Sequence, residues 1–397
     1  MRSGANAHEF DVIHVTNELA SGKTGGVGTV ADNLASGLSK LGLRALWFLV
    51  SDEGKPKSHH RLMGDVVVMT GRLEELHCYS APVLHIHCYE PHEALLEICR
   101  ERPSVYTIHS LLLWEARSND IDLTPSVRWQ EQLIGAVDRV VVISEAECDA
   151  YARLGYLNIN RKISVVHNGL RSSGTFRSPR DAGTIGFCGR LVPRKRPEYP
   201  QIILNEPGFA DCCALIAGRG FSPYARDLLV RENLEGRVRY LGWCTGSRLE
   251  AFFDSIDVLA VPSTYEPFGL VALEAMARGI PVVCPGSGGL VEALGDHAFY
   301  CGSTSFEDFR SAMTRWIESS RRERDAMAQA ALRRYQERFT DLHMARGYAN
   351  LYAQIAAAHG ASLDIVDKTA EPEIGEAVVR GLKTAVGRPD LDGNRSP

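Results

Sequence analysis

Short apolar runs rich in Val and Ile alternate along this sequence with longer stretches of helical periodicity, and this alternation constrains the fold more than any other feature. Continuous apolar runs are typical of strands buried on both faces of a parallel sheet, because such strands have no polar face. In the first part of the chain the predicted strands are Asp11–Val15, Leu46–Val50, Val66–Met69, Val83–Ile86, Val105–Ile108, Val140–Ile143 and Ile163–Val166. This part is therefore predicted to be a doubly wound α/β domain.

The composition changes between Asn168 and Gly183, where the sequence NGLRSSGTFRSPRDAG is rich in Gly, Ser, Arg and Pro. Such a composition is typical of a linker. The alternation then restarts, and strands are predicted at Ile185–Cys188, Ala214–Ala217, Val238–Leu241, Val258–Val261 and Pro281–Cys284. Two Rossmann-like doubly wound domains in tandem explain this pattern better than one large sheet does.

The last part of the chain is predicted to be helical and then irregular. A long charged helix is predicted over Phe306–Tyr335 and a further helix over Leu342–Ala358, whereas the residues beyond Gly360 carry only isolated apolar pairs. We expect the second helix to cross back to the first domain. The predicted parts are an amino-terminal domain, a carboxy-terminal domain, the crossing helix and a flexible tail, at residues 1–178, 179–341, 342–359 and 360–397.

The charge balance excludes some partners. The chain has 44 Lys and Arg against 49 Asp and Glu, a formal net charge of −5, so it has no global positive field to hold nucleic acid. No apolar run approaches the ~18 residues of a membrane span, and the ten cysteines form no Cys-x-x-Cys pair. We therefore expect a cytoplasmic protein with no integral membrane segment, no nucleic-acid partner and no zinc site, while the oligomeric state stays open.

A glycine-rich loop follows the first predicted strand. Gly25, Gly26, Val27 and Gly28 precede a helical stretch, so the backbone could approach a ligand at the helix start, where unpaired N–H groups attract anions. A merely tight turn would explain the same residues. A Walker phosphate loop is disfavoured, because the glycine that it requires is replaced by Asn17.

Several histidines and a pair of aspartates also precede the linker. His109 follows a predicted strand directly and so belongs at the carboxyl edge of the sheet, where open α/β folds bind ligands. His85 and His87 share one face of a strand, and we expect at least one of them to be a hydrogen-bonded core residue. Asp120 and Asp122 could clamp a divalent cation, but a solvated loop with a helix cap explains them better, so no metal site is predicted.

A cationic loop, GRLVPRKRP, follows the first predicted strand of the second domain. In it Arg190 offers a planar fork of donors and Lys195 a point charge, and both suit a diphosphate. A solvated basic loop is the alternative interpretation of this segment alone.

A second loop, in the segment PSTYEPFGLVALEAMARG, opens a predicted helix. Phe268, Gly269 and Leu270 can present backbone N–H groups to an anion at the helix start. Glu266 and Glu274 stand eight positions apart and can face one cleft, where they would accept hydrogen bonds from the hydroxyls of a polar ligand. Many hydroxyls in one ligand point to a sugar.

Together these motifs resemble the GT-B glycosyltransferases, in particular the retaining glycosyltransferase family four and its glycogen-synthase-like relatives. The resemblance extends to about Ala358 and rests on Glu266-x7-Glu274, on GRLVPRK and on the amino-terminal KTGGVG. It implies two Rossmann-like domains that face each other across a cleft. It also implies retaining transfer of a hexosyl group from a nucleotide diphosphate sugar, most commonly a UDP-sugar, to an acceptor hydroxyl, with no cofactor.

The resemblance assigns roles to the residues of the second domain. Arg190 and Lys195 would clamp the diphosphate of the donor. Glu274 would accept the ribose hydroxyls, and Glu266 would contact sugar hydroxyls, assisted by the amides of Phe268, Gly269 and Leu270. Because these cations and amides can stabilise the charge that develops on the leaving diphosphate, no metal ion is required.

The resemblance also assigns roles in the first domain. Gly25, Gly26 and Val27 would close over the phosphates, and His109 would stand beside the donor sugar. Asn168 matches the Asn-Gly that ends the first domain of the family.

The acceptor is expected to be a small, polyhydroxylated and cationic molecule. Acidic residues gather in the loops of the first domain, with Glu18 and Glu90 as acceptor-side candidates together with Asn168. The acidity resembles that of transferases that glycosylate aminocyclitols in aminoglycoside antibiotic pathways. Ordinary surface charge, another metabolite or glycan as acceptor, and a non-catalytic nucleotide-sugar-binding protein of the same fold are the alternatives.

Overall fold

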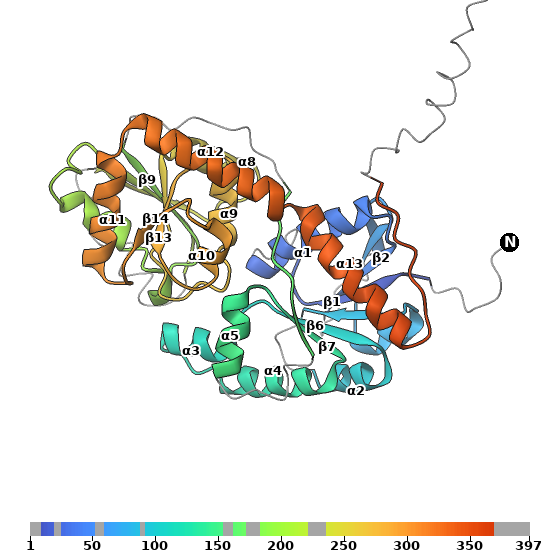
Figure 1. Cartoon of the computed structure of the whole chain (residues 1–397). Coiled ribbons are helices and arrows are strands. Elements are labelled where there is room, and N and C mark those ends of the chain that lie inside the picture. The colour runs from blue at the N-terminus through green and yellow to red at the C-terminus, as the bar shows by residue number, and fades with distance from the viewer. Residues whose placement is uncertain are drawn as a thin grey trace, which may run out of the picture.

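Two α/β domains make up the chain, each with a mostly parallel sheet between layers of helices (Figure 1). The computed structural model describes residues 9–19, 25–51, 59–87, 92–153, 162–171, 183–220 and 236–368. The expected domain boundary at residue 178 and the acceptor candidate Glu90 lie outside the described residues. The doubly wound fold predicted for both halves is confirmed.

The first sheet has eight strands in the order β3-β4-β2-β1-β5-β6-β7-β8. All neighbours pair in parallel except β3 and β4, which are antiparallel. The strands are β1 (Val12–Thr16), β2 (Ala45–Val50), β3 (His59–Met63), β4 (Val66–Gly71), β5 (Leu84–Ile86), β6 (Ser104–Ile108), β7 (Arg139–Val142) and β8 (Ile163–Val165). The edge strand β3 was not predicted, because its sequence HHRLM lacks the continuous apolar run of a buried strand.

Helices cover both faces of this sheet. On one face α1 packs in the same apolar cluster as the last helix, α13, and on the other face α2 and α4 pack together. The helices of this domain are α1 (Gly26–Lys40), η1 (Leu73–Cys78), α2 (Glu93–Glu101), α3 (Leu112–Asn119), α4 (Thr124–Ala136) and α5 (Glu145–Arg153).

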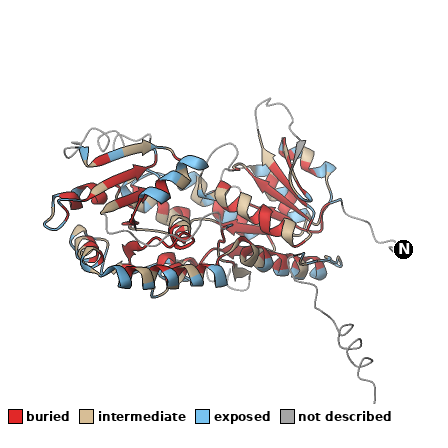
Figure 2. Cartoon of the chain, turned by 90° about the horizontal axis from the view of Figure 1, so that it is seen from above, coloured by how far each residue is buried: buried red, intermediate tan, exposed pale blue. Residues whose placement is uncertain are grey.

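The second sheet has six strands, all parallel, in the order β11-β10-β9-β12-β13-β14. Its strands are β9 (Thr184–Cys188), β10 (Cys213–Ala217), β11 (Val238–Gly242), β12 (Val258–Ala260), β13 (Val282–Pro285) and β14 (Phe299–Cys301). The short edge strand β14 was not predicted. The burial map shows that the apolar residues of both sheets form the interior of each domain (Figure 2).

The helices of the second domain vary in length. They are η3 (Pro193–Lys195), α6 (Tyr199–Ile202), η4 (Ile203–Asn205), α8 (Ser247–Ser255), α9 (Leu270–Met276), α10 (Gly289–Leu294), α11 (Phe306–Glu318) and α12 (Arg321–Arg338). The single helix predicted over Phe306–Tyr335 is wrong, because α11 and α12 are separate. Ser320 starts α12 with a capping box, in which its hydroxyl accepts from Glu323 N and the Glu323 carboxylate accepts from Ser320 N.

The last helix, α13 (Asp341–Ala358), returns to the first domain and lies against α1 (Figure 1). Its Asp341 carboxylate accepts from Ser36 Oγ at 2.7 Å and from Lys40 Nζ at 2.6 Å. The chain passes between the domains twice, and the two passages run together, since Leu170 N donates to Phe339 O and Asp341 N donates to Leu170 O, each at 2.9 Å.

The expectation of a flexible tail from residue 360 onward needs correction in its first part. Residues 361–368 lie against the first domain, where Val366 N donates to Leu41 O at 3.1 Å and Arg346 pairs with Asp367 at 2.5 Å. The apolar side chains of Ala361, Leu363 and Ile365 pack on the cluster of α1 and α13. Within the described ranges, no helix has both the length and the apolarity to cross a membrane.

Candidate active site

Loops at the carboxyl ends of the strands of both sheets meet between the domains. Ser144, after β7, donates its hydroxyl hydrogen to Pro267 O at 2.8 Å, and Pro267 belongs to the loop after β12. The Glu292 carboxylate of α10 accepts from the backbone N–H of Glu145 at 2.8 Å and also pairs with His167. Ligands of open α/β sheets bind at such edges, so the candidate site lies between them.

The predicted cationic loop leads from β9 into η3 and carries four cations, Arg190, Arg194, Lys195 and Arg196. Arg190 donates to the Glu115 carboxylate of α3, so it reaches across to the first domain. The buried Arg194 lies 3.5 Å from the same carboxylate and donates to Tyr265 O at 2.8 Å. Two of the charges of this loop, those of Arg190 and Arg194, therefore reach the interdomain face, so the alternative of a merely solvated basic loop does not hold for them.

Lys195 and Glu266 form a buried ion pair in the second domain. The Glu266 carboxylate also accepts from Ser263 Oγ at 3.2 Å. Burial alone would raise the pKa of Glu266, but Lys195 and Arg194 outweigh it and hold that pKa below its ordinary value. Burial lowers the pKa of Lys195 in turn. The structure thus brings the cation of one predicted motif and the carboxylate of the other into direct contact.

The second glutamate of the motif lies within α9. Burial raises the pKa of Glu274 to about 7, although Arg278, one turn later, opposes the shift. Arg278 itself donates to Glu250 at 2.7 Å and to the backbone carbonyl of Glu274 at 2.8 Å. Near neutral pH the side chain of Glu274 is therefore present both as a carboxylic acid, which can donate a hydrogen bond, and as a carboxylate, which only accepts. Both forms can bind hydroxyls.

The start of α9 is shaped by Gly269, which has φ of +95°. A side chain there would collide with Leu290 of α10, and the left-handed backbone also favours glycine. Among the described residues, the N–H groups of Phe268, Gly269 and Leu270 donate to no backbone carbonyl. These donors remain available for an anion, as the sequence predicts.

The glycine loop of the first domain approaches this helix start. Gly26 begins α1, and a Cβ atom added to it would lie 3.7 Å from Leu270 Cδ1. A Cβ atom on Gly25 would meet the Glu18 carboxylate, so Glu18 lies directly beside the glycine loop. Gly26 thus faces Leu270 of the second domain, with Gly25, the half-buried Val27 and Glu18 beside it in the first domain.

His109 lies at the carboxyl end of β6, as predicted, and is half-buried. Its Nε2 atom is 3.0 Å from Nδ1 of His87, which is buried. His85 is a hydrogen-bonded core residue, in contact with Tyr352 Oη at 2.5 Å and Thr107 Oγ1 at 2.7 Å. The prediction that at least one of His85 and His87 belongs to the core is confirmed.

Asn168 lies in the first passage between the domains rather than on an open acceptor surface. It is 2% exposed, and its Oδ1 atom has no hydrogen-bond partner within the described ranges. The adjacent Gly169 packs against Thr340 of the returning passage. The position of Asn168 favours a structural role at the crossover over contact with an acceptor.

Three further residues join the two sheet edges, and the sequence analysis assigned no donor-site role to them. Tyr265 Oη donates to the Glu147 carboxylate of α5 at 2.9 Å and accepts from Leu111 N at 3.1 Å. The Glu115 carboxylate forms ion pairs with both Arg190 and Arg194. Their position in the sequence could have identified them, because Glu115 and Glu147 lie in the helices that directly follow β6 and β7.

Both of these acids are buried, but their pKa values move in opposite directions. Burial raises the pKa of Glu147 to about 7, since no cation compensates for it. Burial also acts on Glu115, but Arg190 and Arg194 outweigh it and lower the pKa of Glu115. At neutral pH the interdomain face therefore contains a fixed negative charge at Glu115 and a partly protonated carboxyl at Glu147.

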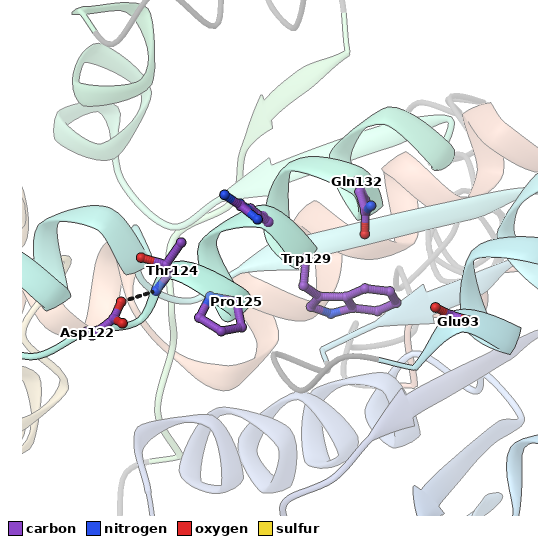
Figure 3. A pocket seen from close by; sticks show the side chains of 7 residues that line it. Glu93, Asp122, Thr124, Pro125, Trp129 and Gln132 are labelled. Carbon is purple, nitrogen blue, oxygen red and sulfur yellow. Dashed lines mark hydrogen bonds between the residues drawn. The ribbon is translucent and has the colours of Figure 1, made fainter.

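A cavity of about 510 Å³ lies in the first domain at the amino-terminal ends of α2 and α4. Figure 3 shows the ring of Trp129 along it, with Glu93 at one end and Asp122 at the other. Asp122 is exposed and accepts from Thr124 N at 2.9 Å, so the predicted solvated loop is confirmed, but the predicted cap is not, because Leu123 is the N-cap of α4 and no side chain caps that helix. The cavity is lined by Glu93, Asp122, Thr124, Pro125, Arg128, Trp129 and Gln132.

Comparison with known families divides the chain into the same two halves. Residues 24–173 match the family described as Glycosyltransferase Family 4, and residues 173–334 match the family described as Glycosyl transferases group 1. The two matches meet within the linker that the composition indicates.

Named relatives are also glycosyltransferases. The chain is 29% identical over 272 residues to an uncharacterized glycosyltransferase of Methanocaldococcus jannaschii, covering 60% of this chain and 67% of the relative. It is 28% identical over 293 residues to the D-inositol 3-phosphate glycosyltransferase of Saccharomonospora viridis, covering 66% of this chain and 67% of the relative.

Solved structures share the fold. Sucrose-phosphate synthase from Thermosynechococcus elongatus superimposes with a TM-score of 0.74 at 20% identity, over 88% of this chain and 100% of the synthase chain. Anabaena HepE in complex with UDP-glucose superimposes with a TM-score of 0.64 at 21% identity, over 88% of this chain and 99% of HepE. With a family 4 domain followed by a group 1 domain, the chain belongs to the glycosyltransferases of the GT-B fold.

Proposed function

We propose that this glycosyltransferase moves a hexosyl group from a nucleotide diphosphate sugar, with UDP as the nucleotide, to a hydroxyl of a small polar acceptor. The observation that carries the proposal is the contact between Lys195 and Glu266 beside the open N–H groups at the start of α9, with Arg190 directed at the interdomain face. Cations and amides suit the diphosphate, and the carboxylate suits the sugar hydroxyls. The UDP-glucose complex of HepE, a protein of the same fold, supports UDP as the nucleotide.

The charges of the site suggest how the transfer is accelerated. When the bond between the anomeric carbon and the phosphate oxygen breaks, negative charge collects on the leaving diphosphate and positive charge on the sugar ring. Preorganised donors aimed at the diphosphate stabilise that charge without reorganising. We propose that Arg190, Lys195 and the α9 amides supply this stabilisation and that the transfer proceeds without a metal ion.

We further propose that the anomeric configuration is retained. In this scheme the acceptor hydroxyl attacks from the face that the diphosphate leaves, and its proton passes to the departing phosphate oxygen. The resemblance of the Glu266-x7-Glu274 motif to retaining transferases supports this stereochemistry. The proton NMR coupling of the anomeric hydrogen in the product tests it, and an inverted product would contradict retention while leaving the transferase activity intact.

For the acceptor we propose a cyclitol that docks in the cavity of the first domain. The exposed Glu93 and Asp122 offer acceptors for hydroxyls and ammonium groups, while Trp129, which also lines the cavity, packs in the core and is only 3% exposed. The two acids favour a cationic aminocyclitol, as in antibiotic biosynthesis. Arg128 favours a phosphorylated cyclitol, such as the D-inositol 3-phosphate of the Saccharomonospora relative.

A direct competition decides between these acceptors. The enzyme is supplied with UDP-glucose and equal amounts of the aminocyclitol 2-deoxystreptamine and D-inositol 3-phosphate, and the products are identified by mass spectrometry. Asp122→Asn should weaken use of the aminocyclitol alone, and Arg128→Gln use of the phosphate alone. If both variants glycosylate either acceptor as the parent protein does, the cavity is not the acceptor site.

The donor proposal is tested by thermal unfolding with a panel of nucleoside diphosphates and nucleotide sugars in EDTA. A ligand at 100 times its dissociation constant stabilises the folded state by about 2.7 kcal/mol. A selective rise in Tm with UDP and UDP-sugars is expected. A folded protein whose Tm responds to no nucleotide would contradict the donor site.

We also propose that the enzyme acts in the cytoplasm. The described cysteines, both buried and exposed, are all free thiols, which is typical of a reducing compartment. Fractionation of the native source, followed by immunodetection, tests this location.

A further inference from the structure

A chain of three histidines runs through the first domain toward the cleft. His14 lies on β1, His87 follows β5 and His109 follows β6, so the chain crosses three neighbouring strands. His14 Nδ1 lies 3.0 Å from His87 Nε2, and His87 Nδ1 lies 3.0 Å from His109 Nε2. His14 and His87 are buried, so this series of contacts links the interior of the sheet to its ligand-binding edge.

All three imidazoles are uncharged near neutral pH. Burial lowers the pKa of His14 to about 3 and that of His109 to about 4, and it lowers the pKa of His87 well below its ordinary value. A neutral imidazole has one N–H group and one bare nitrogen. The two hydrogen bonds must therefore point in the same direction along the chain, either from His14 to His109 or from His109 to His14.

The buried end of the histidine chain decides the direction of its hydrogen bonds. His14 Nε2 is inaccessible to solvent and has no hydrogen-bond partner among the described residues. The His14 ring is stacked on Trp47, with a centroid distance of 3.9 Å. A buried N–H group without an acceptor is rarer in proteins than a buried acceptor without a donor. The bare nitrogen is thus expected at His14 Nε2, which places the proton on His14 Nδ1.

We propose that His87, oriented by His14, is a positioning residue that donates its Nδ1–H to His109 Nε2 and so fixes His109 as the Nδ1–H tautomer. His109 then meets the cleft as a neutral hydrogen-bond donor. A donor at this place suits a phosphate oxygen or a sugar hydroxyl of the nucleotide sugar. This contact with the nucleotide sugar rests on the proposed function, whereas the direction of the hydrogen bonds between the histidines does not.

A metal ion is a less suitable interpretation of the same residues. Nitrogen atoms of His14, His85 and His87 lie within 4.8 Å of one another. Both nitrogens of His85 already have partners, however, in Tyr352 at 2.5 Å and Thr107 at 2.7 Å. His14 and His87 direct nitrogens at each other instead of at a common point. A hydrogen-bonded chain accounts for these contacts without an ion.

The experiment measures tautomers directly in the donor-free protein. Two-bond correlations between imidazole ¹⁵N and carbon-bound ¹H nuclei distinguish Nδ1–H from Nε2–H at each histidine, and single His→Gln variants at exposed sites help to assign the signals. The expected result is a fixed Nδ1–H tautomer at His109, His87 and His14. An Nε2–H tautomer at His109 would overturn the proposal, as would a stoichiometric amount of zinc in the purified protein.

A variant tests whether His87 is what fixes His109. In His87→Leu the partner of His109 Nε2 is lost, so the His109 signals should become those of mixed tautomers. Turnover should fall about tenfold, the factor that corresponds to one hydrogen bond of about 1.4 kcal/mol, with little change in KM for the donor. A fixed Nδ1–H tautomer at His109 in this variant would show that His87 has no positioning role.

Tyr352→Phe is the matched control. It removes a buried hydroxyl from the same layer, but that hydroxyl contacts His85 and no member of the chain. This variant should keep both the His109 tautomer and the turnover, even where Tm falls. If no donor and acceptor give any transfer, the proposed function fails, but the tautomer measurement still decides the direction of the chain.

Discussion

The two sheet edges that meet between the domains carry different chemistry. The edge of the second domain presents the cations Arg190, Arg194 and Lys195, of which Lys195 pairs with Glu266 of the same domain and the two arginines pair with Glu115 of the first domain. The edge of the first domain presents neutral imidazoles and carboxylates, of which Glu115 and Glu147 reach the other domain. A diphosphate needs fixed positive charge, whereas an acceptor hydroxyl does not, so under the proposed function we expect the donor at the edge of the second domain and the acceptor at the edge of the first.

The largest expected effect comes from removing a cation from the donor side. Lys195→Ala and Arg190→Ala should each lower kcat about 100- to 1000-fold, or about 3 to 4 kcal/mol, because each variant loses a preorganised donor to the leaving diphosphate. Steady-state kinetics with UDP-glucose checks this.

A neighbouring cation offers the matched control for these variants. Arg196 belongs to the same loop but lies over the ring of Tyr199, so Arg196→Ala should leave kcat nearly unchanged. Equal losses in Arg196→Ala and Lys195→Ala would mean that the loop contributes general charge instead of a defined clamp.

The next effect concerns Glu274, which we expect to contact the ribose. Its pKa of about 7 means that the carboxylate, the stronger acceptor, predominates only above neutral pH. The affinity for UDP should therefore rise several-fold from pH 6 to pH 8. In Glu274→Gln, calorimetric titrations should show weaker binding of UDP and no rise in affinity with pH. A rise of equal size in the variant would show that another group causes the pH dependence.

Stability provides a test of the acidic edge. The pKa of Glu147 is raised from its ordinary value to about 7, so the folded state holds its proton more tightly and loses stability as the pH rises from about 4.5 through 7. Glu147→Gln cannot ionise and keeps an acceptor for Tyr265. At pH 8 it should be more stable than the parent protein by roughly 1 to 3 kcal/mol, and at pH 5 the two should be similar. Denaturant unfolding at both pH values measures the difference.

The smallest effect tests whether Glu115 and the diphosphate compete for Arg190. Glu115 neutralises this arginine in the ligand-free chain, so Glu115→Gln should free it for a diphosphate. Since Arg190 is half-exposed, the gain should be near 1 kcal/mol, about fivefold in the Kd of UDP, and should shrink at high salt. Weaker binding of UDP in the variant would instead show that Glu115 orients Arg190 for the ligand.

The fold was predictable where buried strands have a distinct sequence pattern. Val140–Ile143 and Val105–Ile108 read as continuous apolar runs, and β7 and β6 lie there. This pattern did not predict the strand β3, because an edge strand has one unpaired side and tolerates polar residues. The break between α11 and α12 was missed because the helical period continues across Ser319 and Ser320.

The candidate site was predictable only in part, because motifs report on residues that are near in sequence. Arg190, Lys195 and Glu266 belong to short motifs at strand ends, and the structure joins Lys195 to Glu266, whereas Arg190 pairs with Glu115 of the first domain. The partnership of Glu147 with Tyr265 joins positions 118 residues apart in the chain, and no local pattern encodes it. The histidine chain likewise depends on the lateral order of β1, β5 and β6, which the sequence alone did not provide.

The return of α13 to the first domain has a consequence for biosynthesis. Tyr348 and Tyr352 are fully buried in the core that α13 shares with α1, so this domain encloses the other as an insertion between its own segments. During translation the second domain leaves the ribosome before the first can complete its core. Nascent chains that stop near residue 335 should expose the apolar face of α1 and attract chaperones, so the domain that is begun first is the one that is finished last.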